Sequence, residues 1–167
     1  MSNPTTITAE PGLPFVEIVR EFDAPVEAVF RAHTDPDLFA KWTGPRGLTM
    51  EIHEFDASTG GRWQYVSTDP AGTAYGFRGV FHTVEPNTSI VQTFEYDGTP
   101  GEVSLGIARF EDLGNGRCRV MSRSVFPSVE SRDGMVASGM EYGVREGYER
   151  LDELVTESDG AAVRAAG

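Results

Sequence analysis

The chain has 167 residues, of which 39% are hydrophobic and 24% charged, and its formal net charge is −12. A domain of this size buries enough surface to form one core. The acidic balance and the absence of a basic stripe exclude a typical nucleic-acid partner. A single cysteine, Cys118, excludes an internal disulfide, and no apolar run approaches the ~20 residues of a membrane span. With no signal-peptide pattern at its start, the chain is expected to be cytoplasmic.

The two ends differ in composition from the rest. Residues 1–13 are rich in Thr, Pro and Gly and predict a flexible N-terminal arm. Residues 158–167 are mostly alanine and glycine and predict a disordered tail. A single domain over residues 14–157 therefore remains.

The first part of this domain predicts one strand followed by two short helices. Phe15 to Phe22 alternates apolar and polar residues, as a half-buried strand does. Ala24-Pro25 ends the strand, and Pro25 suits the first turn of a helix. A second short helix is expected from Asp35-Pro36 to about Trp42, where Gly44-Pro45 ends it.

Six strands then follow one another with short, turn-like connections. Such connections force neighbouring strands to be antiparallel. The expected ranges are Leu48–Asp56, Arg62–Thr68, Tyr75–Glu85, Ser89–Tyr96, Glu102–Glu111 and Arg117–Phe126.

A long amphipathic helix is predicted after the strands. Its apolar residues recur at helical spacing, and three glycines, Gly139, Gly143 and Gly147, occur four apart beside them. Each glycine costs a helix about 1 kcal/mol relative to alanine. Their spacing therefore predicts either close packing of the helix on a sheet or a hollow between the two. Glu146 and Arg150 form an i,i+4 pair expected only to solubilise the outer face.

Five motifs in this order resemble a known family. They are Phe22-Asp23-Ala24-Pro25 with Val29-Phe30, Thr34-Asp35-Pro36 with Trp42-Thr43-Gly44-Pro45, Gly60-Gly61-Arg62-Trp63, Thr93-Phe94-Glu95-Tyr96, and the closing helix from Ser138 to Leu154. Over about residues 15–156 the chain resembles the SRPBCC group, also called START-like or birch-pollen-allergen-like. The branch it resembles most is that of bacterial homologues of the activator of the ninety-kilodalton heat-shock protein ATPase.

The resemblance implies an α+β helix-grip fold. In this fold a curved antiparallel sheet wraps around a long C-terminal helix, with two short helices after the first strand and a hydrophobic cavity between sheet and helix. Members of the group are lipid or polyketide binders, cyclases, hydrolases or co-chaperone domains, so the fold alone does not define the function. Thr43 replaces the second tryptophan of a frequent family motif, so any wall that this tryptophan provides is missing.

An apolar cavity would be lined by aromatic residues of the strands and apolar residues of the closing helix. The candidate ligand-binding residues are Trp42, Trp63, Tyr65, Phe77, Phe81, Phe94, Tyr96, Met140 and Val144. Plain core packing is the alternative for about half of them, since aromatic residues also dominate ordinary cores. Trp42 either forms the cavity mouth or plugs the corner between helix and strand.

Little in the sequence predicts catalysis or a cofactor. His33, His53 and His82 lack zinc-ligand spacing and are expected to be surface residues, so we predict no metal. No nucleotide-binding glycine motif follows a strand, and no cofactor is predicted. Glu51, Glu95 and Glu141 are the acids that could approach the pocket, and Cys118 is interpreted as a small core thiol. No catalytic residue is assigned.

Three hypotheses for the function remain. The first is a protein that binds a hydrophobic or amphipathic small molecule between the sheet and the closing helix. The second is a cyclase or hydrolase that uses the same pocket, which requires two ionisable side chains facing one enclosed volume. The third is a co-chaperone-like interaction module. A homodimer through a sheet edge or helix face also remains open.

Overall fold

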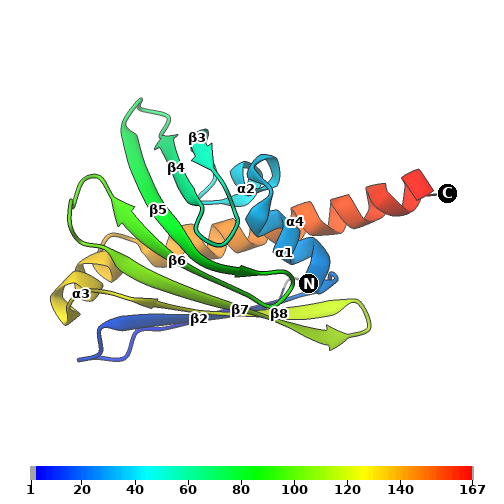
Figure 1. Ribbon diagram of the computed structural model, residues 1–167, viewed down its shortest axis with the longest axis horizontal. Helices are drawn as coiled ribbons and strands as arrows, with labels where there is room; N and C mark the ends of the chain where they lie inside the picture. Colours follow the sequence, from blue (N-terminus) through cyan, green and yellow to red (C-terminus); the bar gives the residue numbers. More distant parts are fainter. Residues whose placement is uncertain (1–2, 167) are drawn as a thin grey trace.

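The computed structural model describes the backbone of residues 3–166 and the side chains of residues 3–156 (Figure 1). Its strands are β1 (Thr5–Thr8), β2 (Phe15–Phe22), β3 (Thr49–Phe55), β4 (Arg62–Thr68), β5 (Ala74–Glu85), β6 (Ser89–Tyr96), β7 (Ser104–Gly114) and β8 (Arg117–Val125). Its helices are α1 (Val26–Thr34), α2 (Pro36–Trp42), α3 (Val129–Ala137) and α4 (Met140–Ala166).

All eight strands form one curved, unclosed sheet. The strand order is β1-β2-β8-β7-β6-β5-β4-β3, and every neighbouring pair is antiparallel. Helix α4 runs through the cup of this sheet, with α1 and α2 toward the half that leads to the C-terminus and α3 at the opposite end (Figure 1). The predicted α+β helix-grip architecture, with two short helices before the meander of strands, is thus confirmed.

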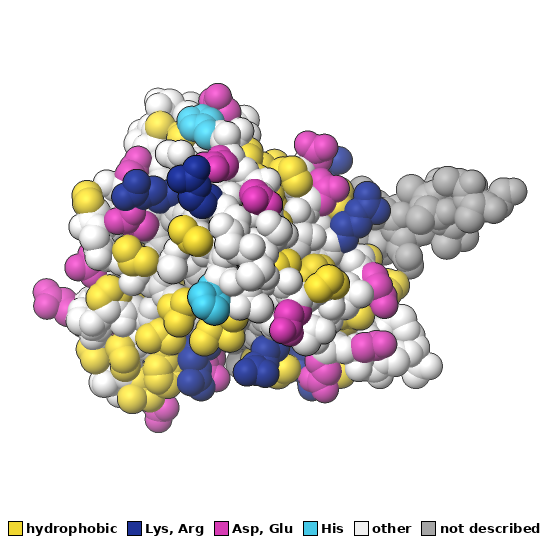
Figure 2. Space-filling model, in the orientation of Figure 1, with side chains coloured by type: hydrophobic (Ala, Val, Ile, Leu, Met, Phe, Trp, Pro, Cys, Tyr) yellow, Lys and Arg dark blue, Asp and Glu magenta, His cyan; other side chains and the backbone are white. Residues whose placement is uncertain are grey.

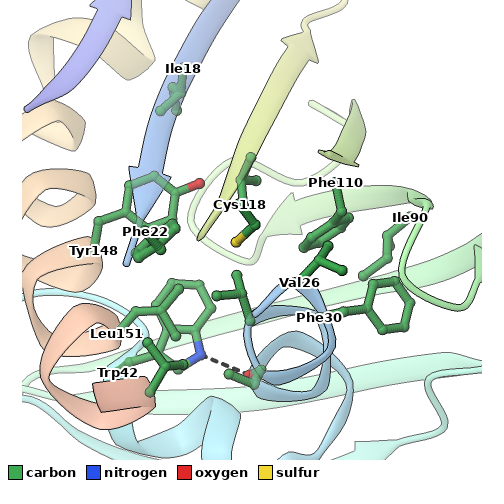
Figure 3. Packing of buried hydrophobic residues seen from close by; sticks show 14 of the residues in the cluster. Ile18, Phe22, Val26, Phe30, Trp42, Ile90, Phe110, Cys118, Tyr148 and Leu151 are labelled. Carbon is green, nitrogen blue, oxygen red and sulfur yellow. Dashed lines mark hydrogen bonds between the residues drawn. The ribbon is translucent and has the colours of Figure 1, made fainter. Parts of the chain in front are cut away.

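The core lies at the end of the cup that α1 and α2 fill. In β2 the alternate residues Val16, Ile18 and Phe22 are buried and point toward α4. Leu151 and Val155 of α4 are almost fully buried against them, and the edge of Phe22 meets the ring of Tyr148 at 5.6 Å. Figure 3 shows Phe22 of β2, Val26 of α1 and Leu151 of α4 converging on one another. Cys118 is buried among them, as expected of a core thiol.

The N-terminal segment expected to be a loose arm contains strand β1. Thr5 to Thr8 pair with Arg20 to Glu17 at the edge of the sheet. Two arginines hold the segment from the other side: Arg145 of α4 donates to the Thr5 carbonyl at 2.6 Å, and the buried Arg132 of α3 donates to the Glu10 carbonyl at 3.0 Å. The backbone carbonyls of Thr5 and Glu10, which would bond to water in a free arm, are thus paired within the protein.

Two helical segments also differ from expectation. Helix α3 was not predicted because its nine residues carry few apolar positions, although Ser128 caps it by accepting from the Ser131 amide at 3.0 Å. Helix α4 continues to Ala166, where a disordered tail from Ser158 was expected. Alanine has the highest helix propensity, so its abundance there is compatible with helix. The domain limits 14–157 stay a prediction.

The three spaced glycines of the closing segment have different roles, and none of them faces the sheet. Gly139 has φ +89° and separates α3 from α4. A Cβ on Gly147 would lie 3.3 Å from the Trp42 carbonyl oxygen, and one on Gly143 would lie 3.4 Å from Pro45. The expectation of close helix–sheet packing at these positions is therefore wrong: Gly147 admits the turn between α2 and β3, and at Gly143 a methyl group would only touch that turn.

Arginine contacts hold α4 to that same turn. Arg150 donates to the carbonyls of Lys41 and Gly44, at 2.5 and 3.2 Å, and Glu146 accepts from the Arg46 amide at 2.7 Å. The expected surface pair of Glu146 and Arg150 is thus replaced by contacts between distant segments. They fix the distance between α2 and α4.

Arg20 is the polar side chain buried most completely beneath α4. It is 1% exposed, lies among the apolar residues of β2, and its guanidinium carbon is 4.7 Å from the centre of the Phe22 ring. Its Nη1 is 3.9 Å from a carboxylate oxygen of Asp152, whereas Nε and Nη2 have no partner. Burial lowers the pKa of Arg20, and the negative charge of Asp152 opposes this effect. Asp152 is therefore the counter-charge that makes the buried arginine tolerable.

The glycine substitutions Gly139→Ala and Gly143→Ala should change stability in opposite directions. The first forces alanine into the left-handed region and should lower the free energy of unfolding by about 1 kcal/mol. The second removes glycine from a helix interior where a methyl group fits, and should raise that free energy by up to about 1 kcal/mol. Urea unfolding monitored by circular dichroism measures both, and equal signs would contradict the assigned roles.

Asp152→Asn should destabilise the fold more than the matched change Glu153→Gln one residue later. Loss of the Asp152 charge removes the strongest of the negative charges that act on the buried Arg20, which costs about 1–3 kcal/mol. Glu153 pairs with Arg46 at a site where both side chains are about half exposed, so its loss should cost under about 1 kcal/mol. Chemical denaturation at pH 7 compares the two, and similar losses would show that Arg20 does not depend on Asp152.

Candidate functional site

Aromatic side chains of β4, β5 and β6 cover the concave face of the sheet. Tyr65 pairs across the strands with Phe77, and Phe77 pairs with Tyr96, so the three side chains share one face. Trp63 and Phe94 lie two residues from Tyr65 and Tyr96 and point the same way. We call these five residues, Trp63, Tyr65, Phe77, Phe94 and Tyr96, the aromatic wall.

The rings of the aromatic wall lean against one another nearly in parallel. Tyr65–Phe77, Phe77–Phe94 and Phe77–Tyr96 have ring centres 5.3 Å apart and interplanar angles of 32–38°. Trp63 stacks on Tyr65 at 5.4 Å and 23°. In the core, by contrast, pairs such as Phe30–Phe110 meet edge to face at 73°. The wall is thus a series of tilted rings with one stacked pair, whereas most ring pairs of the core meet edge to face.

Burial decreases along the wall toward the end of the cup that α1 and α2 leave uncovered. Trp63 and Tyr65 are 4% and 6% exposed, and Phe39 of α2 lies against Tyr65 with ring centres 5.6 Å apart. Phe77, Phe94 and Tyr96 are only half-buried. A group of half-buried rings on a concave face is the kind of surface that binds apolar ligands.

Apolar residues of the two C-terminal helices lie at this same end of the molecule. Met140 and Val144 in the first turns of α4, and Met135 and Val136 in α3, are half-buried and pack against the core cluster. Of the nine candidate residues, five therefore remain accessible: Phe77, Phe94, Tyr96, Met140 and Val144. The other four, Trp42, Trp63, Tyr65 and Phe81, are buried.

Trp42 plugs the corner between α2 and β3. It is 8% exposed, its ring stacks on Tyr148 at 6.0 Å, and its indole nitrogen donates to the Ala32 carbonyl at 2.8 Å (Figure 3). The indole nitrogen of Trp42 thus has a hydrogen-bond partner, and its ring is covered by the rings of His33 and Tyr148. Very little of its surface is accessible to a ligand. Of the two interpretations of Trp42, the packing one agrees with these contacts.

His33 is not the surface histidine that the sequence suggested. Its ring lies against Trp42 and Phe110, with centres 4.8 and 5.0 Å away, and Nδ1 bonds to the Val29 carbonyl at 2.8 Å. Burial lowers the pKa of His33 to about 4, partly opposed by that carbonyl. The sequence signal that could have found it is its position on the apolar side of α1.

Trp63 has an unsatisfied polar atom. Its ring packs over Gly79, where a Cβ would come within 2.6 Å of the indole and 2.0 Å of the Thr93 carbonyl. Because Gly79 has no side chain, the indole can pack against the backbone at this position of the wall. The indole N–H is buried and has no hydrogen-bond partner among the described residues. Sequence reasoning had no means to find this feature.

Two hollows lie mainly on the opposite, outer face of the sheet, although Trp63 also borders the first and Phe77 the second. Their volumes are about 280 and 230 Å³, and both include Arg78 and Glu95, which form a 2.6 Å ion pair. Since β5 and β6 cross in front of α4 in Figure 1, Figure 2 views this face, where hydrophobic and charged side chains are mixed. Ligand pockets usually exceed about 300 Å³ and are mostly apolar, so these hollows fit a ligand poorly.

The candidate acids do not converge on the aromatic wall. Glu95 lies on the outer face, where the Gly101 amide and Arg78 hold its pKa below the usual range. Glu51 is exposed on edge strand β3, and Glu141 lies in the first turn of α4. Burial raises the pKa of the Cys118 thiol to about 12, which keeps it protonated. No three metal-ligating side chains cluster within the described residues.

The fold and the concave wall together define a helix-grip protein of the SRPBCC type. A family model described as "Activator of Hsp90 ATPase homolog 1-like protein" matches residues 23–156, and the chain belongs to this family. None of the described helices is long and apolar enough to cross a membrane.

Solved structures agree with this assignment. A crystal structure from Rhodobacter sphaeroides is 27% identical, with a TM-score of 0.82 over 92% of this chain and 99% of that one. A solution structure from Arthrobacter aurescens is also 27% identical, with a TM-score of 0.83 over 91% of both chains. The AHSA1 protein of Silicibacter pomeroyi has the same fold, at 24% identity and a TM-score of 0.71 over 86% of this chain and 99% of that one. No protein of curated function matches the chain.

The neutral state of the half-buried His33 should make stability depend on pH. Between pH 6.5 and about 4 the unfolded chain binds a proton that folded His33 does not, so stability decreases as pH falls through this range. The loss from pH 6.5 to 5 should be about 1–2 kcal/mol. His33→Phe should reduce this slope, whereas the exposed His53→Gln should not. Unfolding free energies at the two pH values give the comparison, and equal slopes in all three proteins would contradict a neutral His33.

Proposed function

We propose that this protein binds a hydrophobic or amphipathic small molecule on the half-buried end of the aromatic wall. The observation that carries the proposal is the burial gradient: Phe77, Phe94 and Tyr96 continue a stacked series whose other members are fully buried. Apolar side chains of this kind gain about 25 cal/mol for each Å² that a ligand removes from water. Met140 and Val144 of α4 supply the apolar surface near this end of the cup.

The composition of the wall favours binding over catalysis. Its ionisable groups are tyrosines, and burial raises the pKa of Tyr65 well above its usual value, so Tyr65 stays a neutral phenol. The neighbouring Tyr75, whose ring centre is 6.3 Å from that of Tyr96, donates its hydroxyl to Asp69 at 3.3 Å. This hydroxyl is therefore already engaged within the protein. A cyclase or hydrolase would need a pair of ionisable groups with separated pKa values at the ligand, and the candidate acids lie elsewhere.

Phe77→Ala should weaken binding of the neutral fluorescent probe N-phenyl-1-naphthylamine. Phe77 contacts three other rings of the wall, and the loss of its surface should cost about 1–2 kcal/mol, or about 5- to 30-fold in Kd. Leu105→Ala is the matched control, because Leu105 is an apolar residue of the same sheet, 38% exposed, on the outer face.

Fluorescence titration gives the dissociation constants, and circular dichroism verifies that each variant is folded at the temperature used. No enhancement of fluorescence with the wild-type protein would overturn the proposed function. Equal weakening by Leu105→Ala would also overturn it, by placing the probe on the outer face.

A further inference from the structure

We propose that the ligand is a neutral, planar aromatic molecule whose acceptor oxygen receives a hydrogen bond from the indole N–H of Trp63. This inference rests on the proposed function and specifies the chemistry of the ligand. Its starting point is that Trp63 Nε1 is a buried donor without an acceptor. A buried donor left unpaired destabilises a protein, so most native structures give each one a partner.

The position of Trp63 within the wall connects this donor to the ligand surface. Its ring stacks on Tyr65 at 5.4 Å and lies 5.8 Å from the half-buried Phe94. Phe94 in turn contacts Phe77, so one continuous aromatic surface leads from the accessible end to the indole. A molecule that binds along Phe94 can therefore present an oxygen to Trp63.

The ring geometry favours a flat ligand. Rings of the wall are separated by 5.3–5.8 Å at angles of 23–38°, so Trp63 and Tyr65 stack and the other pairs are tilted face toward face. A planar aromatic molecule continues such a series with the same contacts that its members make with one another. A bulky, saturated molecule does not.

The charge of the surroundings favours a neutral ligand. The described wall consists of neutral side chains, and the arginines next to it in its strands, Arg62 and Arg78, alternate to the outer face and pair with Glu54 and Glu95. An anion bound at the indole would lose its hydration without gaining a counter-charge. A neutral acceptor, such as an aryl ketone oxygen, needs only the hydrogen bond.

Two probes of the same shape test the inference: 2-acetylnaphthalene, which carries a carbonyl acceptor, and 2-isopropenylnaphthalene, in which a methylene group replaces that oxygen. The ketone should bind the wild-type protein about 3- to 10-fold more tightly than the alkene. In Trp63→Phe, which keeps an aromatic ring but lacks the donor, the two affinities should become equal.

The chain provides an internal control for the same experiment. In a ¹⁵N–¹H correlation spectrum its two tryptophans give two indole signals, and the N–H of Trp42 already donates to Ala32. The ketone should move the Trp63 signal downfield and leave the Trp42 signal in place, so the result does not depend on the folding of a variant.

The outcomes separate the two proposals. Binding of both probes with equal affinity and an unmoved Trp63 signal would overturn the role of the indole, while the proposed function would stand. Failure of both probes to bind would overturn the proposed function, and the inference with it. Tighter binding of the ketone together with the downfield shift supports both.

Discussion

The attachment of α4 at one end of the cup determines the rest of the architecture. Tyr148 and Leu151 pack against β2 and the α2–β3 turn, Arg150 binds the carbonyls of that turn, and Arg20 meets Asp152 beneath the helix. Helices α1 and α2 occupy the same end, so the core closes there. Because α4 is fixed in this way, its first turns cannot also cover β5 and β6, and the aromatic wall stays partly accessible.

The rings of the core and those of the aromatic wall meet at different angles because different elements cover them. Where α1, α2 and α4 press on the sheet, rings come from several directions and meet edge to face, as Phe22 and Tyr148 do at 79°. Where only neighbouring strands supply the rings, cross-strand spacing sets them side by side at shallower angles, as for Phe77 and Tyr96 at 32°. Edge-to-face pairs thus prevail in the core, where Trp42 and Tyr148 are the stacked exception, and none of the ring pairs within the wall is edge to face.

The sequence predicted the sheet well because its turns and alternation are local signals. The bounds of Arg62–Thr68 and Ser89–Tyr96 agree with the structure, and the SRPBCC resemblance placed α4 correctly over the sheet. Strand β1 was missed, although its β-branched residues Thr5 to Thr8 were a usable signal. The glycines of α4 and the position of His33 depend on which distant segment approaches them, and periodicity cannot supply that information. For the same reason, the sequence named nine candidate residues without separating the four buried ones from the five accessible ones.

The structure leaves unpaired donors on two large inward-facing side chains of the described sheet, and their surroundings give them different roles. Arg20 lies near Asp152, and the negative charges of Glu149 and Asp23 act on it as well, so charges of the protein itself compensate its guanidinium. Trp63 is surrounded by Tyr65, Phe94 and the backbone at Gly79, and the side chains among these present it with no charge. The positive charge of Arg20 is thus compensated within the protein, because α4 carries Asp152. The indole lacks a partner from the chain, and its ring adjoins Phe94, where the accessible part of the aromatic wall begins. An unpaired donor next to an accessible apolar surface is the combination that a binding site requires.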